Sequence, residues 1–221
     1  MGVVGAGILV VGATGAVGGQ AAGQLAGRGA ALALAGRDPG RLRERASALG
    51  GRPRRSFDAY DLDGCARLAA WAEGQLGRLD ALVVAVGVAG FGPAAEVSDA
   101  SAEHLLTVNA LAPMAVVRGA LDVLSPGGAV AVVTGAIVDR PVRGMADYAA
   151  AKTALATWLG VVGREVRRDR IGVIDVRMPH LDTPFAARAA VGTAPALGPG
   201  ADPVEAVREH LVLPLLDALG R

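Results

Sequence analysis

Two residues spaced four apart in the second half of the chain have the types needed for acid–base chemistry. Tyr148 and Lys152 lie in the stretch Asp-Tyr-Ala-Ala-Ala-Lys that begins at residue 147, and residues four apart face the same side of a helix. A lysine ammonium beside a phenol favours the phenolate and lowers the pKa of the tyrosine. Such a pair can give a proton to a carbonyl oxygen or take one from an alcohol. Because Tyr-x-x-x-Lys is common by chance, its meaning depends on the elements that position it.

The chain opens with an apolar run that stops at a glycine-rich turn. Residues 8–11 are followed by Gly12, Gly15 and Gly18 in the spacing G-x-x-G-x-x-G, and then by a helical segment. This order of strand, turn and helix is what a dinucleotide-binding unit requires. Gly12 permits the tight turn, Gly15 lets the backbone approach a pyrophosphate, and Gly18 lets the helix pack closely on the strand. The helix N-terminus then offers N–H groups to the phosphates. The alternative is a tight turn that binds no ligand.

Length and composition are those of one α/β domain spanning residues 1–221. Lys+Arg number 22 against Asp+Glu 21, for a net charge of +1, which argues against a nucleic acid or a membrane surface as the main partner. The single cysteine, Cys65, excludes an internal disulfide and fits a reducing compartment. We find no signal peptide and no apolar run near the roughly 20 residues of a membrane span. The sequence therefore predicts a soluble, cytoplasmic protein, and we predict no metal site.

Apolar runs alternate with helical patterns from end to end, which predicts a parallel sheet covered on both faces. The right-handed crossover rule gives a doubly wound sheet with strand order 3-2-1-4-5-6. Pro113 should kink one long helix, residues 179–203 should form a partly mobile substrate loop, and no seventh strand is evident after residue 203. Strands are expected at 8–11, 31–35, 54–57, 79–86, 129–133 and 171–176, and helices at 20–26, 39–49, 62–76, 98–124, 146–168 and 204–219.

Taken together, these pieces resemble the short-chain dehydrogenase/reductase family over nearly the whole chain. Asp58 lies in an Asp-Ala-Tyr-Asp stretch that matches the family's acidic turn and would face the adenine. Asn109 matches the family's helix asparagine, which holds a water of the proton relay. The resemblance implies a Rossmann fold, a nicotinamide cofactor, and catalysis by Tyr148, Lys152 and Asn109. It places the following residues at the cofactor: Gly12, Thr14, Gly15, Ala16, Val17, Gly18, Arg37, Asp58, Ala85, Gly87, Tyr148, Lys152, Pro179 and Thr183.

The chain also departs from the family pattern at positions that bear on activity. Gly135 occupies the position of the family's catalytic serine. Thr134 could supply a hydroxyl to the substrate if the strand end shifts by one residue, or it could simply bond to backbone. Residues 84–87 read Val-Ala-Val-Gly where common members have Asn-Asn-Ala-Gly. His180 replaces the glycine that follows Pro179, and it either reaches the substrate pocket or only caps the loop.

Cofactor choice rests on the end of the second strand. Members that prefer NAD carry an acid there, whereas this chain has Gly36 followed by Arg37, a residue suited to a 2′-phosphate. Asp38 lies near the place where the dinucleotide fingerprint seeks an acid, but Pro39 makes a helix cap its simpler role. We therefore predict NADP(H) rather than NAD(H), with Arg37 and Thr14 near the phosphate.

The leading hypothesis is an NADPH-dependent oxidoreductase, a carbonyl reductase or an alcohol dehydrogenase in reverse, that acts on a small molecule. A non-redox isomerase, dehydratase or cyclase on the same fold is one alternative, and a catalytically inactive nucleotide-sensing protein is another. Faces rich in Ala and Val on helices 98–124 and 146–168 predict a homodimer or homotetramer. The substrate pocket is predicted to include Phe91, Arg140, Arg143, His180 and Phe185.

Overall fold

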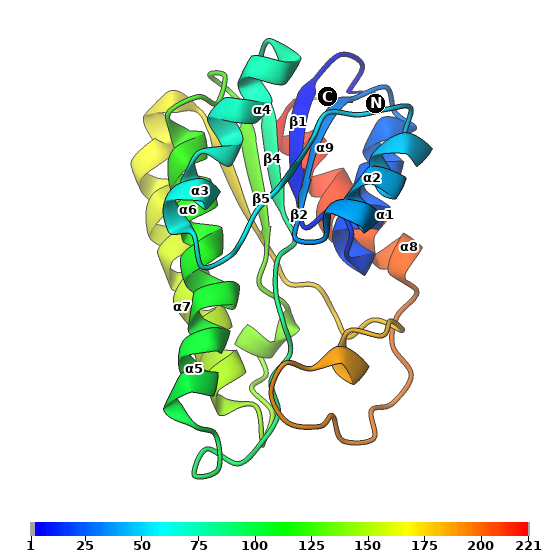
Figure 1. Ribbon diagram of the computed structural model, residues 1–221. Helices are drawn as coiled ribbons and strands as arrows, with labels where there is room; N and C mark the ends of the chain where they lie inside the picture. Colours follow the sequence, from blue (N-terminus) through cyan, green and yellow to red (C-terminus); the bar gives the residue numbers. More distant parts are fainter. Residues whose placement is uncertain (1–2, 221) are drawn as a thin grey trace.

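Six short segments pair side by side as parallel strands in the computed structural model, which describes residues 3–220. The strand order is β3-β2-β1-β4-β5-β6, so the predicted order is confirmed (Figure 1). The direction of strand addition reverses between β1 and β4, and in such sheets ligands bind at the carboxyl ends of the strands near the reversal. The strands are β1 (Gly7–Val11), β2 (Ala31–Gly36), β3 (Arg54–Ser56), β4 (Ala81–Val84), β5 (Ala129–Val133) and β6 (Gly172–Val176).

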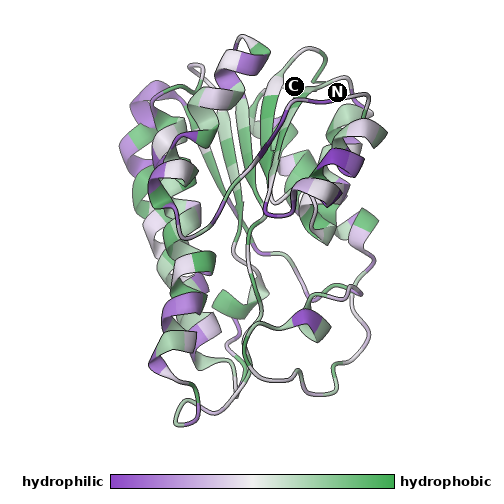
Figure 2. Ribbon diagram, in the orientation of Figure 1, coloured by the Kyte–Doolittle hydropathy of each residue, from purple (hydrophilic) through white to green (hydrophobic). Residues whose placement is uncertain are grey.

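Helices cover both faces of the sheet, and their apolar sides face it (Figures 1 and 2). One layer holds α1 (Ala16–Ala26), α2 (Pro39–Ala48), α8 (Pro203–Val207) and α9 (Leu213–Ala218). The opposite layer holds α3 (Leu62–Ala66), α4 (Leu68–Leu76), α5 (Asp99–Leu106), α6 (Ala112–Leu121) and α7 (Ala146–Glu165). In β1, Ile8 and Val10 pack into the first layer and Leu9 and Val11 into the second. A strand buried on both faces is apolar at every position, which explains the uninterrupted run of the sequence.

Two helices widen into a π turn immediately before a proline. One π turn, Thr107–Leu111, joins α5 to α6 ahead of Pro113, and the other, Arg208–Val212, joins α8 to α9 ahead of Pro214. Proline has no N–H to donate to the carbonyl four residues earlier, and in the first helix this carbonyl belongs to Asn109. In place of the kink that the sequence predicts at Pro113, the structure has a π turn within a continuous helix.

Some predicted helix bounds differ from the structure. The predicted helix 62–76 is two helices, α3 and α4, separated at Arg67. At this break α6 packs closely, since a Cβ on Gly119 would lie 1.9 Å from the carbonyl oxygen of Ala66. The predicted helix 146–168 ends as an α-helix at Glu165 and tightens into a 3-10 turn, Val166–Asp169, a common way for a last turn to satisfy its carbonyls.

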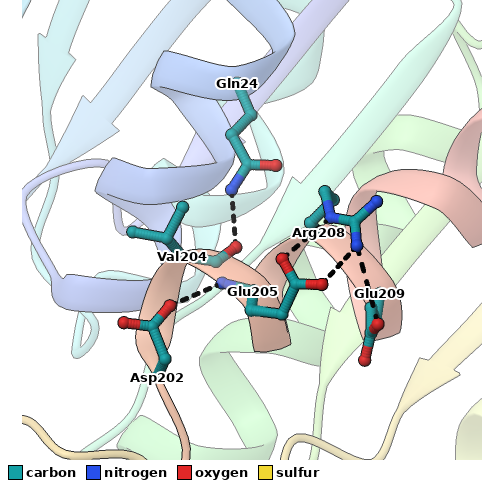
Figure 3. A network of polar contacts seen from close by, with 6 residues as sticks. All are labelled: Gln24, Asp202, Val204, Glu205, Arg208 and Glu209. Atoms are coloured by element: carbon teal, nitrogen blue, oxygen red, sulfur yellow. Dashed lines mark hydrogen bonds and ion pairs between the residues drawn. The ribbon is translucent and has the colours of Figure 1, made fainter.

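The segment between β6 and α8 is closed at its base by bonds between its own ends, and it is bonded to the rest of the fold in its middle and just past its end. At its base, Asp182 N–H donates to the Ala201 carbonyl at 3.0 Å, and Ala201 N–H donates to the His180 carbonyl at 2.8 Å. In its middle, Phe91 N–H donates to the Val191 carbonyl at 2.8 Å. Past its end, Asp202 caps α8 by accepting from Glu205 N–H at 2.8 Å, and the Gln24 side chain on α1 donates to the Val204 carbonyl at 2.9 Å (Figure 3).

Within residues 3–220, one helix is long and apolar enough to cross a membrane by length and composition alone. It is the continuous helix Asp99–Leu121, and 56% of its most apolar window is buried inside the fold. Because the core helix of a globular domain passes the same test, this helix is weak evidence for a membrane span.

Candidate active site

The glycine turn packs too closely for any side chain at two of its three glycines. Gly12 has φ of +89°, and a Cβ there would lie 2.4 Å from the carbonyl oxygen of Ala85 after β4. A Cβ on Gly18 would lie 2.3 Å from the carbonyl oxygen of Gly12. The first contact joins the turn to the strand across the reversal, and the second brings α1 against the turn. These are the tight turn and the close helix packing that the spacing predicts.

The N-terminus of α1 faces this turn without a side chain to cap it. Gly15 is the N-cap residue, it is exposed, and no acidic residue follows in the first turn. The N–H groups of Ala16 and Val17 therefore lie at the positive end of the helix dipole with no carboxylate to compete for them. Bare N–H groups beside a close glycine backbone form a suitable cradle for a pyrophosphate. The residues present thus fit the dinucleotide that the motif implies.

The carboxyl end of β2 adjoins the glycine turn, and the acid that follows it is used as a helix cap. A Cβ on Gly36 would lie 3.3 Å from the side chain of Thr14, so the two positions adjoin. The Asp38 carboxylate turns back to cap α2, where it accepts from Arg41 N–H at 2.9 Å. Arg37 is exposed beside it. The cap geometry agrees with the predicted role of Asp38.

Arg41 is a cationic residue at this corner that sequence reasoning missed. Its guanidinium donates to the Thr14 carbonyl at 2.8 Å. This bond places a positive charge from α2 beside the glycine turn. The available signal was its position four residues after Arg37, which places both arginines at the start of the same helix. Asp58, predicted to face the adenine, is exposed after β3, and its carboxylate accepts from Tyr60 N–H at 3.0 Å.

Tyr148 and Lys152 lie on the buried side of α7, in its first two turns. Tyr148 is 9% exposed and Lys152 is 3% exposed. The ammonium of Lys152 donates to the carbonyl of Val133, the last residue of β5, at 3.1 Å, and to that of Val86, two residues after β4, at 3.4 Å. Lys152 is also the only lysine in the sequence; the other basic residues are arginines. Burying an ammonium costs free energy even when it is hydrogen-bonded, so a lysine kept in this position indicates a function.

Burial is the main cause of the pKa shifts of Tyr148 and Lys152. It raises the pKa of Tyr148 to about 12, which is opposite to the lowering expected from a lysine neighbour. The reason is that the phenol loses solvent while the ammonium is turned toward backbone carbonyls. Burial lowers the pKa of Lys152 to about 8, against an opposing effect of the Asp175 carboxylate. Tyr148 is therefore a neutral phenol at physiological pH and can act as a proton donor.

Asn109 and Lys152 converge on Gly87, just after β4. A Cβ on Gly87 would lie 2.8 Å from Asn109 Oδ1 and 3.1 Å from Lys152 Nζ. The Asn109 amide is bonded on both sides to Val88: it accepts from the Val88 N–H and donates to the Val88 carbonyl, each at 3.0 Å. Asn109 lies within the π turn before Pro113, and single π turns are frequent at functional sites. The predicted residues Asn109, Lys152 and Gly87 thus come together.

Residues 6–192 match the family model described as short chain dehydrogenase. The chain belongs to the short-chain dehydrogenase family. Its members are oxidoreductases that use nicotinamide cofactors, and the chain has the six-stranded parallel sheet expected of them. No curated protein matches the chain significantly.

Crystal structures of other short-chain dehydrogenases share the fold. A dehydrogenase/reductase from Sinorhizobium meliloti has a TM-score of 0.85 and 25% identity, over 97% of this chain and 88% of that chain. A protein described as a short-chain oxidoreductase from Thermus thermophilus has a TM-score of 0.79 and 32% identity, over 94% of each chain. An alcohol dehydrogenase from the archaeon Thermococcus sibiricus, complexed with 5-hydroxy-NADP, has a TM-score of 0.83 and 24% identity, over 95% of this chain and 89% of that chain.

This short-chain dehydrogenase has a glycine at the family's serine position, and the hydroxyl of the preceding threonine is bonded within the fold. Gly135, at the serine position, has φ of +95°, a conformation that side chains rarely adopt. Thr134 is 1% exposed, and its hydroxyl donates to the carboxylate of Asp175 on β6. The hydroxyl is thus bonded to a side chain and not to backbone, which was one of the two roles predicted from the sequence. Its contact with substrate stays a prediction.

The residues predicted to contact substrate are spread over three loops at the carboxyl end of the sheet. Phe91 is buried beside Tyr148, where both line a small apolar void with Met145 and Val191. Arg140 and Arg143 are exposed in the segment before α7. His180 and Thr183 line a separate, open cavity of about 640 Å³ within the 180–200 segment. Other predicted contacts are only half-buried or exposed here: Ala85, Pro179 and Phe185.

Proposed function

We propose that this protein is an NADPH-dependent oxidoreductase that interconverts a carbonyl compound and its alcohol. The observation that carries the proposal is Lys152. It is the only lysine of the chain, it is 3% exposed, and it lies four residues from the buried phenol of Tyr148. The Asn109 amide adjoins it at Gly87. A single lysine placed in this way is expected of a proton-transfer site.

The residues would divide the chemistry as follows. The nicotinamide, when bound, supplies hydride to the carbonyl carbon. Tyr148 donates its phenolic proton to the carbonyl oxygen, which its pKa of about 12 permits across the physiological range. The Lys152 ammonium stabilises the phenolate that remains and binds the nicotinamide ribose. The backbone carbonyl of Asn109 receives no hydrogen bond from Pro113, four residues later, because proline has no N–H. This carbonyl holds the water that returns a proton to the site.

The preference for NADPH rests on the corner at the end of β2. Arg37 and Arg41 both flank Gly36, and Arg41 is already anchored to the glycine turn through the Thr14 carbonyl. The one nearby acid, Asp38, is used as a helix cap. Guanidinium groups bind phosphates through paired hydrogen bonds. The Thermococcus sibiricus neighbour is complexed with 5-hydroxy-NADP, which agrees with this preference.

A fluorescence titration with NADPH and NADH tests cofactor choice. Arg37→Gln and Arg41→Gln should each weaken NADPH binding about tenfold, the equivalent of one charge-assisted hydrogen bond, and should barely change NADH binding. The matched control is Arg43→Gln, an exposed arginine on the same helix. Equal losses for both nucleotides, or no binding of either, would contradict the assignment.

Turnover is tested with a panel of aldehydes and ketones and the Tyr148→Phe variant. We expect Tyr148→Phe to lose turnover while its NADPH affinity stays close to that of the unsubstituted protein, because the hydroxyl acts on substrate and not on the nucleotide. Unchanged turnover in this variant would refute the proton-donor role. The titration with NADPH serves as the folding control.

A second candidate is non-redox chemistry, such as isomerisation, dehydration or cyclisation, on the same fold. The specific observation in its favour is the absence of a hydroxyl at Gly135, together with the commitment of the Thr134 hydroxyl to Asp175. Product formed without a change in nicotinamide absorbance would favour this alternative. A pure nucleotide sensor is disfavoured because it has no use for a buried Lys152.

We further propose that the substrate is a small molecule and that the protein is cytoplasmic. We also propose that it forms a homodimer or homotetramer through the outer faces of the helices Asp99–Leu121 and Ala146–Glu165. Exposed apolar side chains on these faces support the assembly; they include Leu106, Leu111 and Val161. Light scattering coupled to size exclusion measures the subunit number, and a monomer at working concentration would refute it.

A further inference from the structure

A carboxylate on β6 lies next to the end of β5 and is held from two sides. Asp175 pairs in register with Val132 of β5. Its carboxylate accepts a hydrogen bond from the Thr134 hydroxyl and forms an ion pair with Arg177 at 2.8 Å. The Asp175 side chain is only 24% exposed. A carboxylate bonded by two neighbours has one orientation, so its charge is fixed in place.

This carboxylate is on the same face of the sheet as Lys152. Val173, two residues before Asp175 on β6, packs against Gly163 of α7, and residues two apart on a strand share a face. Asp175 therefore faces α7. The Lys152 side chain extends from α7 toward β5 and donates to the carbonyl of Val133, the residue next to Thr134. The ammonium and the carboxylate thus approach β5 at adjacent residues.

Asp175 is the one carboxylate among the described residues whose charge raises the pKa of Lys152, opposing the burial that lowers it to about 8. The Arg177 guanidinium pairs with the Asp175 carboxylate and, at 3.7 Å, with the Asp139 carboxylate. Apart from buried Tyr148, the other titratable or charged side chains on α7 and on the elements packed against it are exposed or half-buried. They are Asp99, Glu103, His104, Arg118, Asp139, Arg140, Asp147, Arg164, Glu165, Arg167, Arg168, Asp169 and Arg177.

We propose that Asp175 is a positioning residue for the active site: braced by Thr134 and Arg177, its carboxylate keeps Lys152 in the ammonium form inside the fold. This inference rests on the proposed role of Lys152. It also gives Thr134 a function, which is to brace the carboxylate and not to contact substrate. Without Asp175, burial alone would act on Lys152 and the lysine would lose its proton at a lower pH.

The single lysine makes this measurable without turnover. In protein grown with lysine labelled with ¹³C at Cε, one side-chain signal reports Lys152, and its shift with pH gives the pKa directly. Asp175→Asn should lower that pKa by about one unit, a tenfold fall in the ratio of ammonium to amine. Asp175→Glu should restore much of the loss. The matched control is Asp139→Asn, which removes the exposed carboxylate on the far side of Arg177 and should leave the pKa nearly unchanged.

Thr134→Val provides an independent variant of nearly equal volume if Asp175→Asn does not fold. It removes the brace, and it should shift the pKa of Lys152 in the same direction by a smaller amount. Titration curves of Asp175→Asn and Thr134→Val that coincide with that of the unsubstituted protein would overturn the inference, as would an equal shift in Asp139→Asn.

The pH profile of carbonyl reduction separates this inference from the proposed function. If both hold, the alkaline limb of the profile moves to lower pH in Asp175→Asn together with the NMR titration. A shifted NMR titration in a protein that reduces no carbonyl supports the link between Asp175 and Lys152 and refutes the reductase function. An active protein whose NMR titration and alkaline limb both stay in place refutes the link alone.

Discussion

Replacing Lys152 by Met should remove a pH-dependent penalty on folding. The lysine titrates at about 8 in the folded protein against a reference of 10.5, so the unfolded chain binds this proton more tightly. The folded state is therefore destabilised by about 3 kcal/mol at neutral pH, and the penalty declines as pH rises through this window. About 2 kcal/mol of it is recovered between about pH 7 and about pH 9.5. Methionine has a similar length and no charge, so it has no such dependence.

The assay is urea unfolding followed by circular dichroism for both proteins at these two pH values. The absolute difference at one pH includes the hydrogen bonds that Lys152 donates to Val133 and Val86, but the change in that difference with pH does not. The unsubstituted protein should gain about 2 kcal/mol relative to Lys152→Met on going from the lower to the higher pH. Tyr148 contributes little, because its folded pKa of about 12 affects stability only near and above its ordinary value of 10. A constant difference would show that Lys152 titrates normally and would refute the reasoning.

Three further substitutions test the local geometry. Gly135→Ser should lower the free energy of unfolding by about 1–2 kcal/mol because of the positive φ, measured by urea unfolding, and should not raise kcat; a faster enzyme would show that the strand end adapts. Asp38→Ala should cost about 1 kcal/mol through loss of the α2 cap and leave the ratio of NADPH to NADH affinity unchanged in fluorescence titrations; a changed ratio would place Asp38 at the ribose instead. Gly87→Ala should reduce kcat about tenfold or more, because its Cβ displaces Asn109 and Lys152; wild-type kcat would mean that these groups are not held in a catalytic geometry.

Local patterns predicted most of the strands and helices, and the right-handed crossover rule then gave the strand order that the structure has. The catalytic and cofactor roles of the site residues stay predictions. Asp38 before Pro39 predicted a cap, and the structure has it. Arg41 was missed because its contact with Thr14 depends on how α2 packs over the turn. Asp175 was missed because strand register alone brings it to Thr134, and the packing of α7 alone brings Lys152 to the same end of β5.

Pro113 shows the same limit within one helix. The missing N–H predicts a disturbance, but whether the helix breaks, bends or widens is decided by the packing around it.

The π turn at Thr107–Leu111 has a consequence for insertions and deletions. A π turn accommodates one more residue than an α-helical turn over the same rise, and each residue turns a helix by about 100°. Deleting Ala110 would close the turn to an α-helical one with α5 and α6 in place, but it would rotate Asn109 away from Val88. A deletion or insertion elsewhere in the helix would rotate the whole of α6 against the sheet. This helix is therefore expected to tolerate substitutions on its outer face far better than any change in length, so that gaps in related sequences should fall in the loops on either side of it.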